Sequence, residues 1–190
     1  MISSLLLAAG ASHRFGAPKL LTELHGKPVI RWSAESLAGL ADEMIVVVGA
    51  DNEPLRRALA GVDVRFVVNE RAGDGMASSI ACGVNALSTR VDAVLVALGD
   101  EPMLPRQAHE RVLERCHAGG PSIIAATYHG VRGHPVLFDR TVFAELAALS
   151  GDHGARAVVD RDPGRVAFVE MGEAHPVDVD TPEDLARLSE

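Results

Sequence analysis

Short apolar runs recur along the chain, and each is followed closely by a glycine, an asparagine or an acidic residue. Residues 2–8, 43–48, 64–68 and 93–98 have the length of a strand and consist mostly of consecutive apolar residues. Continuous runs of this kind are typical of strands covered on both faces. The pattern predicts four strands of a sheet packed between helices.

Helical spacing of apolar positions fills the gaps between these runs. We predict helices over residues 29–40, 52–60, 76–87 and 105–116, and a short extended piece at 20–24 followed by a turn at 25–28. Strands and helices that alternate with short linkers imply right-handed crossovers and a largely parallel sheet. The 190 residues fit one domain, residues 1–190. We expect a single-domain, three-layer, Rossmann-like α/β fold with a mostly parallel sheet.

The second half of the chain is less regular. We predict strands at 122–127 and 166–169, a loop at 130–135 that leads into an apolar segment at 136–138, and helices at 141–149 and 153–160. Thr181 and Pro182 predict a capped start for one more helix, because threonine is a good N-cap and proline suits the first turn.

A loop rich in small residues follows the first strand, between Leu7 and Lys19. Its backbone can approach a ligand closely, and successive N–H groups form an anion-binding concavity to which Arg14 and Lys19 add two cations. These are the features of a triphosphate site, although the spacing meets neither the P-loop nor the dinucleotide-binding fingerprint. The alternative is a glycine-rich turn with two solvated basic residues.

Acidic side chains stand where a metal ion for such a site is expected. Ligands gather at the carboxyl ends of parallel strands, so the loops at Ala9, Asn69 and Asp100 should face a common cleft. Asp100 is well placed there to hold Mg²⁺ on phosphate oxygens, unless it only caps the next turn. Asp178 and Asp180 point the same way on an extended segment, and one of them could complete the site. The alternative is an Asx turn before the last helix.

Charge and composition narrow the classes of partner. Hydrophobic residues make up 47% and charged residues 23%, and the formal net charge is −8. This charge argues against nucleic acid or an anionic membrane as a partner, so a polyphosphate would need a local basic pocket and a metal ion. The apolar start is too short for a signal peptide or a membrane span, and we expect a cytoplasmic protein. Cys82 and Cys116 lack metal-ligand spacing and are expected to be buried thiols.

Five ordered motifs resemble those of one enzyme family. The loop LAAGASHRFGAPK at residues 7–19 resembles the signature loop of nucleotidyltransferases of the MobA-like branch, most closely the molybdenum cofactor cytidylyltransferases. LGDEP at 98–102 is similar to the family's metal motif, with Glu101 in place of the usual glutamine. Asn69 with GMASS at 75–79, GHP at 133–135 with GDHGAR at 151–156, and DVDTPED at 178–184 resemble the remaining three.

The resemblance implies a role for each matching residue. Arg14, Lys19 and Asp100 would be catalytic, and Asp100 and Asp180 would hold the metal. Nucleotide binding would fall to Leu7, Ala8, Ala9, Gly10, Ser12, Arg14, Lys19, Asn69, Gly75 and Ser79. His134 and Arg156 would bind the acceptor phosphate. The plain alternatives are a capped helix start at Met76 and a structural histidine at position 134.

The implied reaction is transfer of CMP from CTP to the molybdenum cofactor, with Mg²⁺ or else Mn²⁺, and with a molybdoenzyme as a transient client. Ala9, Gly75-Met76 and the GHP segment favour CTP over GTP. The alternatives within the enzymes are a guanylyltransferase for the same cofactor and a cytidylyltransferase for a sugar or polyol phosphate. From another class, the chain could be a non-catalytic cofactor carrier or maturation factor, although such a carrier does not need Lys19, Asp100 and Asp180.

Overall fold

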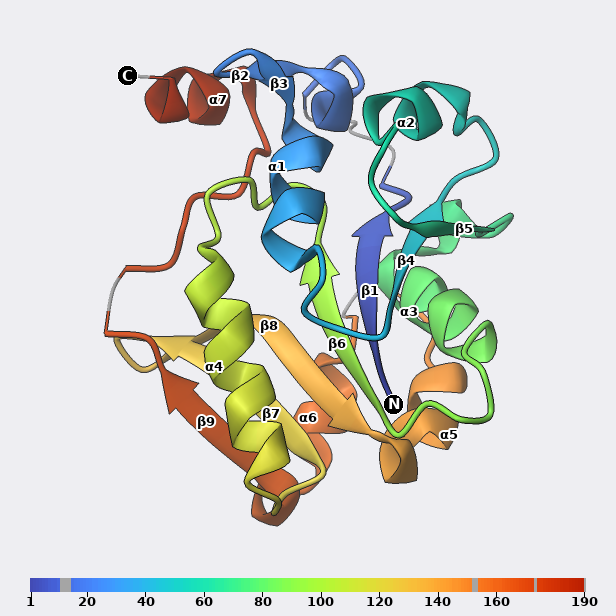
Figure 1. Cartoon of the computed structure of the whole chain (residues 1–190), viewed down its shortest axis with the longest axis vertical. Coiled ribbons are helices and arrows are strands. Elements are labelled where there is room, and N and C mark those ends of the chain that lie inside the picture. Colours follow the sequence, from blue (N-terminus) through green and yellow to red (C-terminus); the bar gives the residue numbers. More distant parts are fainter. Residues whose placement is uncertain (11–14, 152–153, 173, 190) are drawn as a thin grey trace.

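A seven-stranded sheet with the order β5-β4-β1-β6-β8-β7-β9 organises the computed structural model, which describes residues 1–10, 15–151, 154–172 and 174–189 (Figure 1). Its first half consists of β1 (Ile2–Ala8), β4 (Glu43–Val48), β5 (Arg65–Val68) and β6 (Ala93–Leu98). These four strands are parallel, and Leu5 pairs with Ile45 on one side and Val96 on the other. The prediction of four parallel strands is confirmed, although β5, at the edge of the sheet, is only partly buried.

The second half of the sheet contains an antiparallel strand that the sequence pattern did not reveal. It consists of β7 (Ile123–Tyr128), β8 (Val131–Asp139) and β9 (Val166–Glu170). β8 runs antiparallel to both β6 and β7, so residues 131–138, predicted as part of a loop and an apolar segment, belong to one strand. His129 and Gly130 both have positive φ, at 50° and 79°, which is the two-residue turn that suits a tight hairpin.

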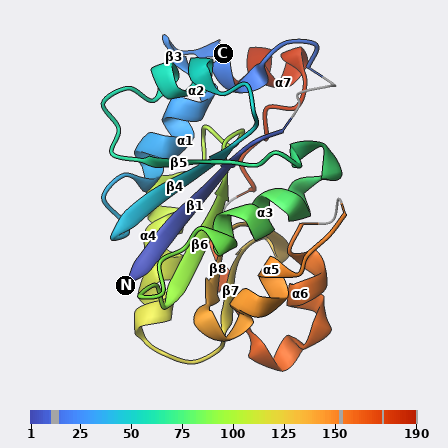
Figure 2. The ribbon, with the colours of Figure 1, turned by 90° about the vertical axis from the view of Figure 1, so that its right-hand side faces the viewer.

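Helices cover both faces of the sheet (Figure 2). They are α1 (Val29–Leu37), α2 (Glu53–Ala58), α3 (Met76–Asn85), α4 (Arg106–His117), α5 (Phe143–Ala147), α6 (Arg156–Arg161) and α7 (Pro182–Leu188). α1 and α4 lie on one side, and α3, α5 and α6 lie on the other. Leu6 and Leu5, adjacent on β1, enter the two opposite hydrophobic cores and are both 0% exposed. The three-layer architecture is therefore confirmed.

Some predicted boundaries were wrong. Residues 20–24 are not one extended piece, because a 3-10 turn (Lys19–Leu21) precedes β2 (Glu23–Leu24), which pairs with β3 (Lys27–Pro28). Helix α1 ends at Leu37, since Gly39 turns the chain with a φ of 72°. No helix within the described part of the chain is both long and apolar enough to cross a membrane.

The C-terminal helix starts as the sequence predicts. The Thr181 hydroxyl accepts a hydrogen bond from the Asp184 N–H at 3.2 Å, and the Asp184 carboxylate accepts one from the Thr181 N–H at 2.8 Å, which is a capping box. Just before it, the Val179 N–H donates to the Asp100 carbonyl at 2.9 Å. These bonds hold the segment 178–181 beside the loop that follows β6.

We expect Glu170→Gln to lower the melting temperature at pH 7. The Glu170 carboxylate accepts hydrogen bonds from the backbone N–H groups of His129, Gly130 and Gly172, and these lower its pKa to about 2 from 4.5. A carboxyl whose pKa falls on folding stabilises the fold above its unfolded pKa and loses that effect as the pH falls. The difference between wild type and variant should shrink from about pH 4.5 towards pH 2 in thermal melts. A difference that stays constant over this range would contradict the assignment.

Candidate active site

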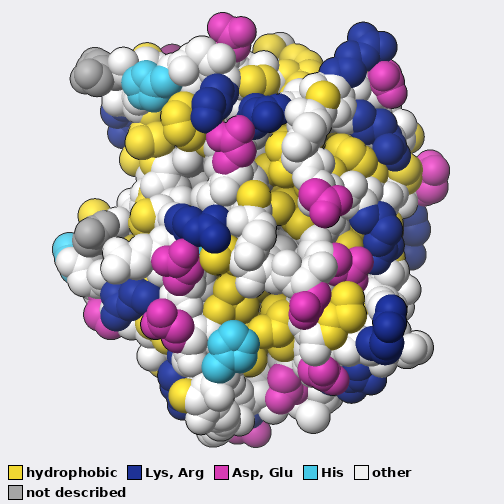
Figure 3. All heavy atoms as spheres, viewed as in Figure 1, with side chains coloured by type: hydrophobic (Ala, Val, Ile, Leu, Met, Phe, Trp, Pro, Cys, Tyr) yellow, Lys and Arg dark blue, Asp and Glu magenta, His cyan; other side chains and the backbone are white. Residues whose placement is uncertain are grey.

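The loops that the sequence analysis expected to share a cleft all leave the same edge of the sheet. β1, β5 and β6 are parallel, so their carboxyl ends, at Ala9, Asn69 and Asp100, lie along that edge (Figure 1). Over the face drawn in Figure 3, acidic and basic side chains of the described residues are interspersed.

A cavity of about 660 Å³ opens beside the glycine loop. Ala8, Ala9 and Gly10, three of the residues predicted to bind the nucleotide, line it, and their contact with a nucleotide stays a prediction. Leu7 does not line it, because its side chain is buried in the core and its carbonyl accepts a hydrogen bond from the Gly99 N–H at 2.9 Å. Cavities of this size hold small-molecule ligands.

Residues from the end of β4 to the first turn of α2 also line this cavity, and sequence reasoning had not singled them out. They are Gly49, Asp51, Pro54 and Leu55. The glycine after β4 was the available signal, since ligands gather at strand ends. The predicted Ser12 and Arg14 lie outside the described residues.

Lys19 joins the two carboxylates predicted to hold a metal. Its Nζ lies 2.6 Å from Asp100 Oδ2 and 2.9 Å from Asp180 Oδ1. Burial disfavours the ammonium, but the attraction and hydrogen bonds of Asp100 and then Asp180 outweigh it and raise the pKa of Lys19. Lys19 therefore stays positively charged at neutral pH.

The donor set of this cluster fits a divalent cation. Asp100 and Asp180 contact the same cationic nitrogen, so their carboxylates converge on one point. Two carboxylates together with substrate phosphates are typical ligands of Mg²⁺. The chain just before Asp100 packs too closely for a side chain at Gly99. A Cβ there would lie 2.8 Å from Ile30 Cδ1 and 3.0 Å from the Leu7 carbonyl oxygen. A side chain at position 99 would push Asp100 out of place.

Asn69, Gly75 and Ser79 shape the loop that opens α3. The Asn69 amide donates to Ser78 Oγ at 2.9 Å and Ser79 Oγ at 3.0 Å, and both Asn69 and Ser79 are buried. Gly75 has a φ of 94°, which side chains rarely adopt. Asn69 and Ser79 therefore hold the loop in shape, and direct contact of these three residues with a nucleotide stays a prediction.

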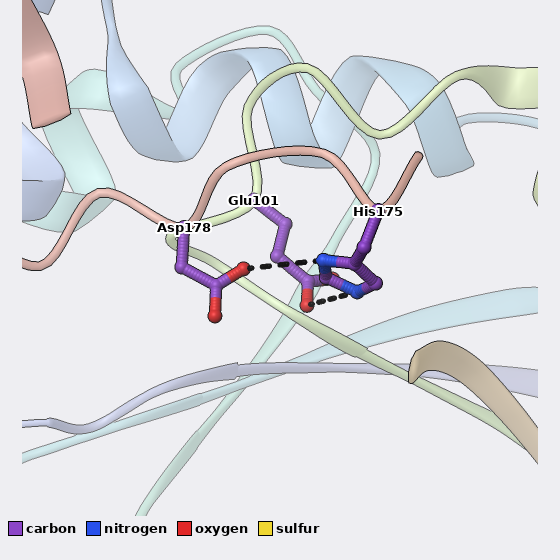
Figure 4. Close-up of side chains that lie close together, drawn as sticks. All are labelled: Glu101, His175 and Asp178. Carbon is purple, nitrogen blue, oxygen red and sulfur yellow. Dashed lines mark ion pairs between the residues drawn. The ribbon is translucent and has the colours of Figure 1, made fainter. Parts of the chain in front are cut away.

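A second cluster of titratable side chains surrounds Glu101. His134 Nδ1 lies 3.0 Å from Glu101 Oε1, and the Glu101 side chain is only 1% exposed. His175 Nε2 is 3.8 Å from the same oxygen, and His175 Nδ1 is 3.9 Å from Asp178 Oδ1 (Figure 4). Gly133 admits the His175 ring, because a Cβ there would lie 2.3 Å from His175 Cδ2.

Burial and the neighbouring charges of this cluster shift the pKa values of Asp178 and His134. Burial, and next the charges of Glu101 and Asp100, raise the pKa of Asp178 to about 6. Burial opposes protonation of His134, but the charge and hydrogen bond of Glu101 outweigh it and raise the His134 pKa. The sequence analysis missed Glu101 and His175 as site residues. The departure of Glu101 from the usual glutamine was the only signal.

Arg156, the second predicted acceptor ligand, is exposed at the start of α6. α6 lies on the sheet face covered by α3 and α5 (Figure 2). The loop before it packs against the start of α3, where the Ala77 N–H donates to the Gly151 carbonyl at 3.3 Å. A shared acceptor site formed by His134 and Arg156 stays a prediction.

Residues 4–166 match the MobA-like NTP transferase domain. Nicotine blue oxidoreductase of Paenarthrobacter nicotinovorans is 33% identical over 98% of this chain and 96% of its own length. The chain also matches several curated bifunctional GlmU proteins, of whose length it spans 26–42%.

Two solved structures share the fold over nearly the full chain. Rv0371c of Mycobacterium tuberculosis H37Rv, in complex with manganese, has a TM-score of 0.81 and 30% identity, covering 98% of this chain and 96% of its own. A nucleotidyl transferase of Methanothermobacter thermautotroptrophicus has a TM-score of 0.83 and 27% identity, covering 100% of this chain and 96% of its own.

Proposed function

This chain belongs to the MobA-like NTP transferase domain family and is a nucleotidyltransferase, and we propose that it transfers CMP from CTP to the molybdenum cofactor. The products are molybdopterin cytosine dinucleotide and pyrophosphate. The single observation that carries the proposal is the Lys19 ammonium held between Asp100 and Asp180, beside a loop of small residues. A cation, metal-binding carboxylates and backbone N–H groups are together well suited to bind a triphosphate.

The proposed functional domain is longer than the region that matches the family. The family match ends at residue 166, yet Asp180 contributes to the Lys19 cluster from the segment before α7. We therefore propose that the functional domain extends over residues 1–190.

The proposed reaction is an in-line displacement. An oxygen of the acceptor phosphate attacks the α-phosphorus of CTP and forms a new P–O bond. The bond from that phosphorus to the oxygen bridging to the β-phosphate breaks, and pyrophosphate leaves with the electron pair. Such a step needs positioning and charge neutralisation more than covalent help from the protein.

We propose one role for each residue of the site. Lys19 binds the triphosphate and steadies the charge on the leaving pyrophosphate, together with Arg14. Ala8, Ala9, Gly10 and Ser12 offer backbone and hydroxyl groups to the phosphates. Asp100 and Asp180 would hold Mg²⁺ or Mn²⁺, which when bound neutralises phosphate charge.

The acceptor is proposed to enter near His134. His134 is fixed by Glu101 through a 3.0 Å hydrogen bond, and its raised pKa favours the protonated ring that an anionic phosphate attracts. Arg156 is proposed as the second phosphate ligand. The choice of the molybdenum cofactor over a sugar or polyol phosphate rests on the likeness of the GHP and GDHGAR segments to that branch of the family.

We expect CTP with Mg²⁺ to raise the melting temperature of the purified protein more than GTP, ATP or UTP. A ligand that binds only the folded state stabilises it by RT ln(1 + [L]/Kd). Thermal melts with each nucleotide, with and without Mg²⁺, give the ranking. Pyrophosphate release that needs both CTP and molybdenum cofactor would then establish the reaction.

Other outcomes of these melts would favour the alternatives. A shift with GTP alone would indicate a guanylyltransferase. A CTP response with pyrophosphate release only for a sugar or polyol phosphate would change the acceptor. The absence of a shift with any nucleotide and of pyrophosphate release would favour a cofactor carrier that serves a client molybdoenzyme.

One observation favours a second candidate function. The relative that matches 98% of this chain is named for an oxidoreductase activity on nicotine blue. Oxidation of NADH or NADPH that depends on nicotine blue would support a redox function here. Lack of such turnover, with pyrophosphate release intact, would exclude it.

A further inference from the structure

The side chains of Glu101, His175 and Asp178 meet in a group that nucleotidyl transfer does not require. One ligand atom from each lies within 4.8 Å of the others. Figure 4 shows the carboxylates of Glu101 and Asp178 on the same side of the His175 ring, each joined to a ring nitrogen by a dashed line. Glu101 and Asp178 come from two segments that the bond from the Val179 N–H to the Asp100 carbonyl holds together.

Two buried carboxylate oxygens of this group lack a partner. Glu101 is 1% exposed, and its Oε2 is buried with no hydrogen bond among the described residues. Asp178 Oδ1 is also buried with no hydrogen bond among the described residues, although the Asp178 side chain as a whole is 44% exposed. A buried charged oxygen without a partner is costly, and two carboxylates that face each other add repulsion. A cation between them would remove both costs.

The His175 ring is oriented as a metal ligand. Its Nδ1 lies 2.7 Å from the Pro176 carbonyl oxygen, so Nδ1 carries the proton and donates it there. Nε2 lies 3.8 Å from Glu101 Oε1, too far for a hydrogen bond, so this nitrogen is the ring atom that can face an ion. An N–H donated to a backbone carbonyl is the usual way in which proteins orient a metal-binding imidazole.

His134 holds Glu101, one of the three side chains of this group, in place. Its Nδ1 bonds Glu101 Oε1 at 3.0 Å and fixes the carboxylate, as residues around metal ligands commonly do. The Tyr128 ring packs edge-on against His175, with ring centroids 4.7 Å apart. The donors are therefore held in place before any ion binds.

We propose that Glu101, His175 and Asp178 bind a divalent transition-metal ion, separately from the Asp100–Asp180 pair. The two donor sets differ in chemistry. Asp100 and Asp180 offer oxygen only and share Lys19, so their metal depends on the added phosphates of a nucleotide. An imidazole with two carboxylates favours Mn²⁺, Fe²⁺ or Zn²⁺ over Mg²⁺ and needs no nucleotide.

Mn²⁺ titration of the nucleotide-free protein, followed by EPR, tests the proposal. We expect one tightly bound Mn²⁺ per chain, and His175→Gln and Asp178→Asn should each weaken it by at least about 10-fold. His117→Gln, which removes an exposed histidine of α4, and Asp180→Asn should retain it. Circular dichroism confirms that each variant is folded, and Asp178→Asn preserves shape if His175→Gln does not fold.

The other outcomes overturn the proposal. An absence of bound Mn²⁺ in the nucleotide-free wild type would do so, as would unchanged affinity in folded Asp178→Asn. Mn²⁺ that is lost in Asp180→Asn but not in Asp178→Asn would place the ion at the Lys19 cluster instead. Failure of nucleotidyl transfer would leave this binding unaffected, so the two proposals fail separately.

Discussion

Lys19→Met is expected to lower kcat/KM for nucleotidyl transfer by about 10²- to 10³-fold, the usual effect of removing one preorganised charge from a transition state. The Nζ of Lys19 is 2.6 Å from Asp100 and 2.9 Å from Asp180, in a position where it can exchange a carboxylate for a phosphate oxygen. Its raised pKa keeps it charged, so the loss should be independent of pH near neutrality. Steady-state pyrophosphate release measures it.

Lys27→Met is the matched control, because Lys27 is the only other lysine in the sequence. Lys27 pairs with Glu35 at 2.7 Å and lies 4.3 Å from the centre of the Trp32 ring. It is half exposed, so its removal should change activity by less than about 2-fold. Equal losses in the two variants would mean that Lys19 acts through general electrostatics and not through the triphosphate.

Asp100→Asn should lower kcat by about 10²-fold or more and shift the Mg²⁺ concentration needed for half-maximal rate upward. Asparagine keeps the shape of the side chain but removes the charge that both Lys19 and a divalent ion need. Chelation of the metal from the wild type should produce a comparable loss that added Mg²⁺ restores, whereas the variant should respond only weakly. The measurement is a Mg²⁺ titration of the initial rate.

The control is Asp92→Asn, an exposed carboxylate that pairs with the N-terminal amine at 2.9 Å. It should leave the Mg²⁺ dependence of the rate unchanged. Wild-type turnover of Asp100→Asn at ordinary Mg²⁺ would refute the metal assignment. The double variant Lys19→Met/Asp100→Asn should lose less than the product of the single losses, because residues in contact act as one unit.

The strands with the clearest apolar runs could be predicted from sequence. β1, β4 and β6 have the predicted bounds, since short runs that are mostly apolar and end at a glycine, an aspartate or small residues are typical of strands covered on both faces. β8 was missed because its first half, with arginine, glycine and histidine after Val131, has no apolar run, and its antiparallel position depends on the two positive-φ residues of the turn before it. The pattern of apolar positions also could not predict the break between the 3-10 turn at Lys19–Leu21 and β2.

The sequence by itself determined the local features of this protein: the small-residue loop ahead of Lys19, the aspartate at the end of β6 and the capping box at Thr181. Each depends on residues within one turn or one strand end. Only the tertiary structure decided which of them meet. Lys19 contacts partners 81 and 161 positions away, and Glu101 contacts histidines on two other segments. Such contacts follow from strand order and register, which local propensity does not encode.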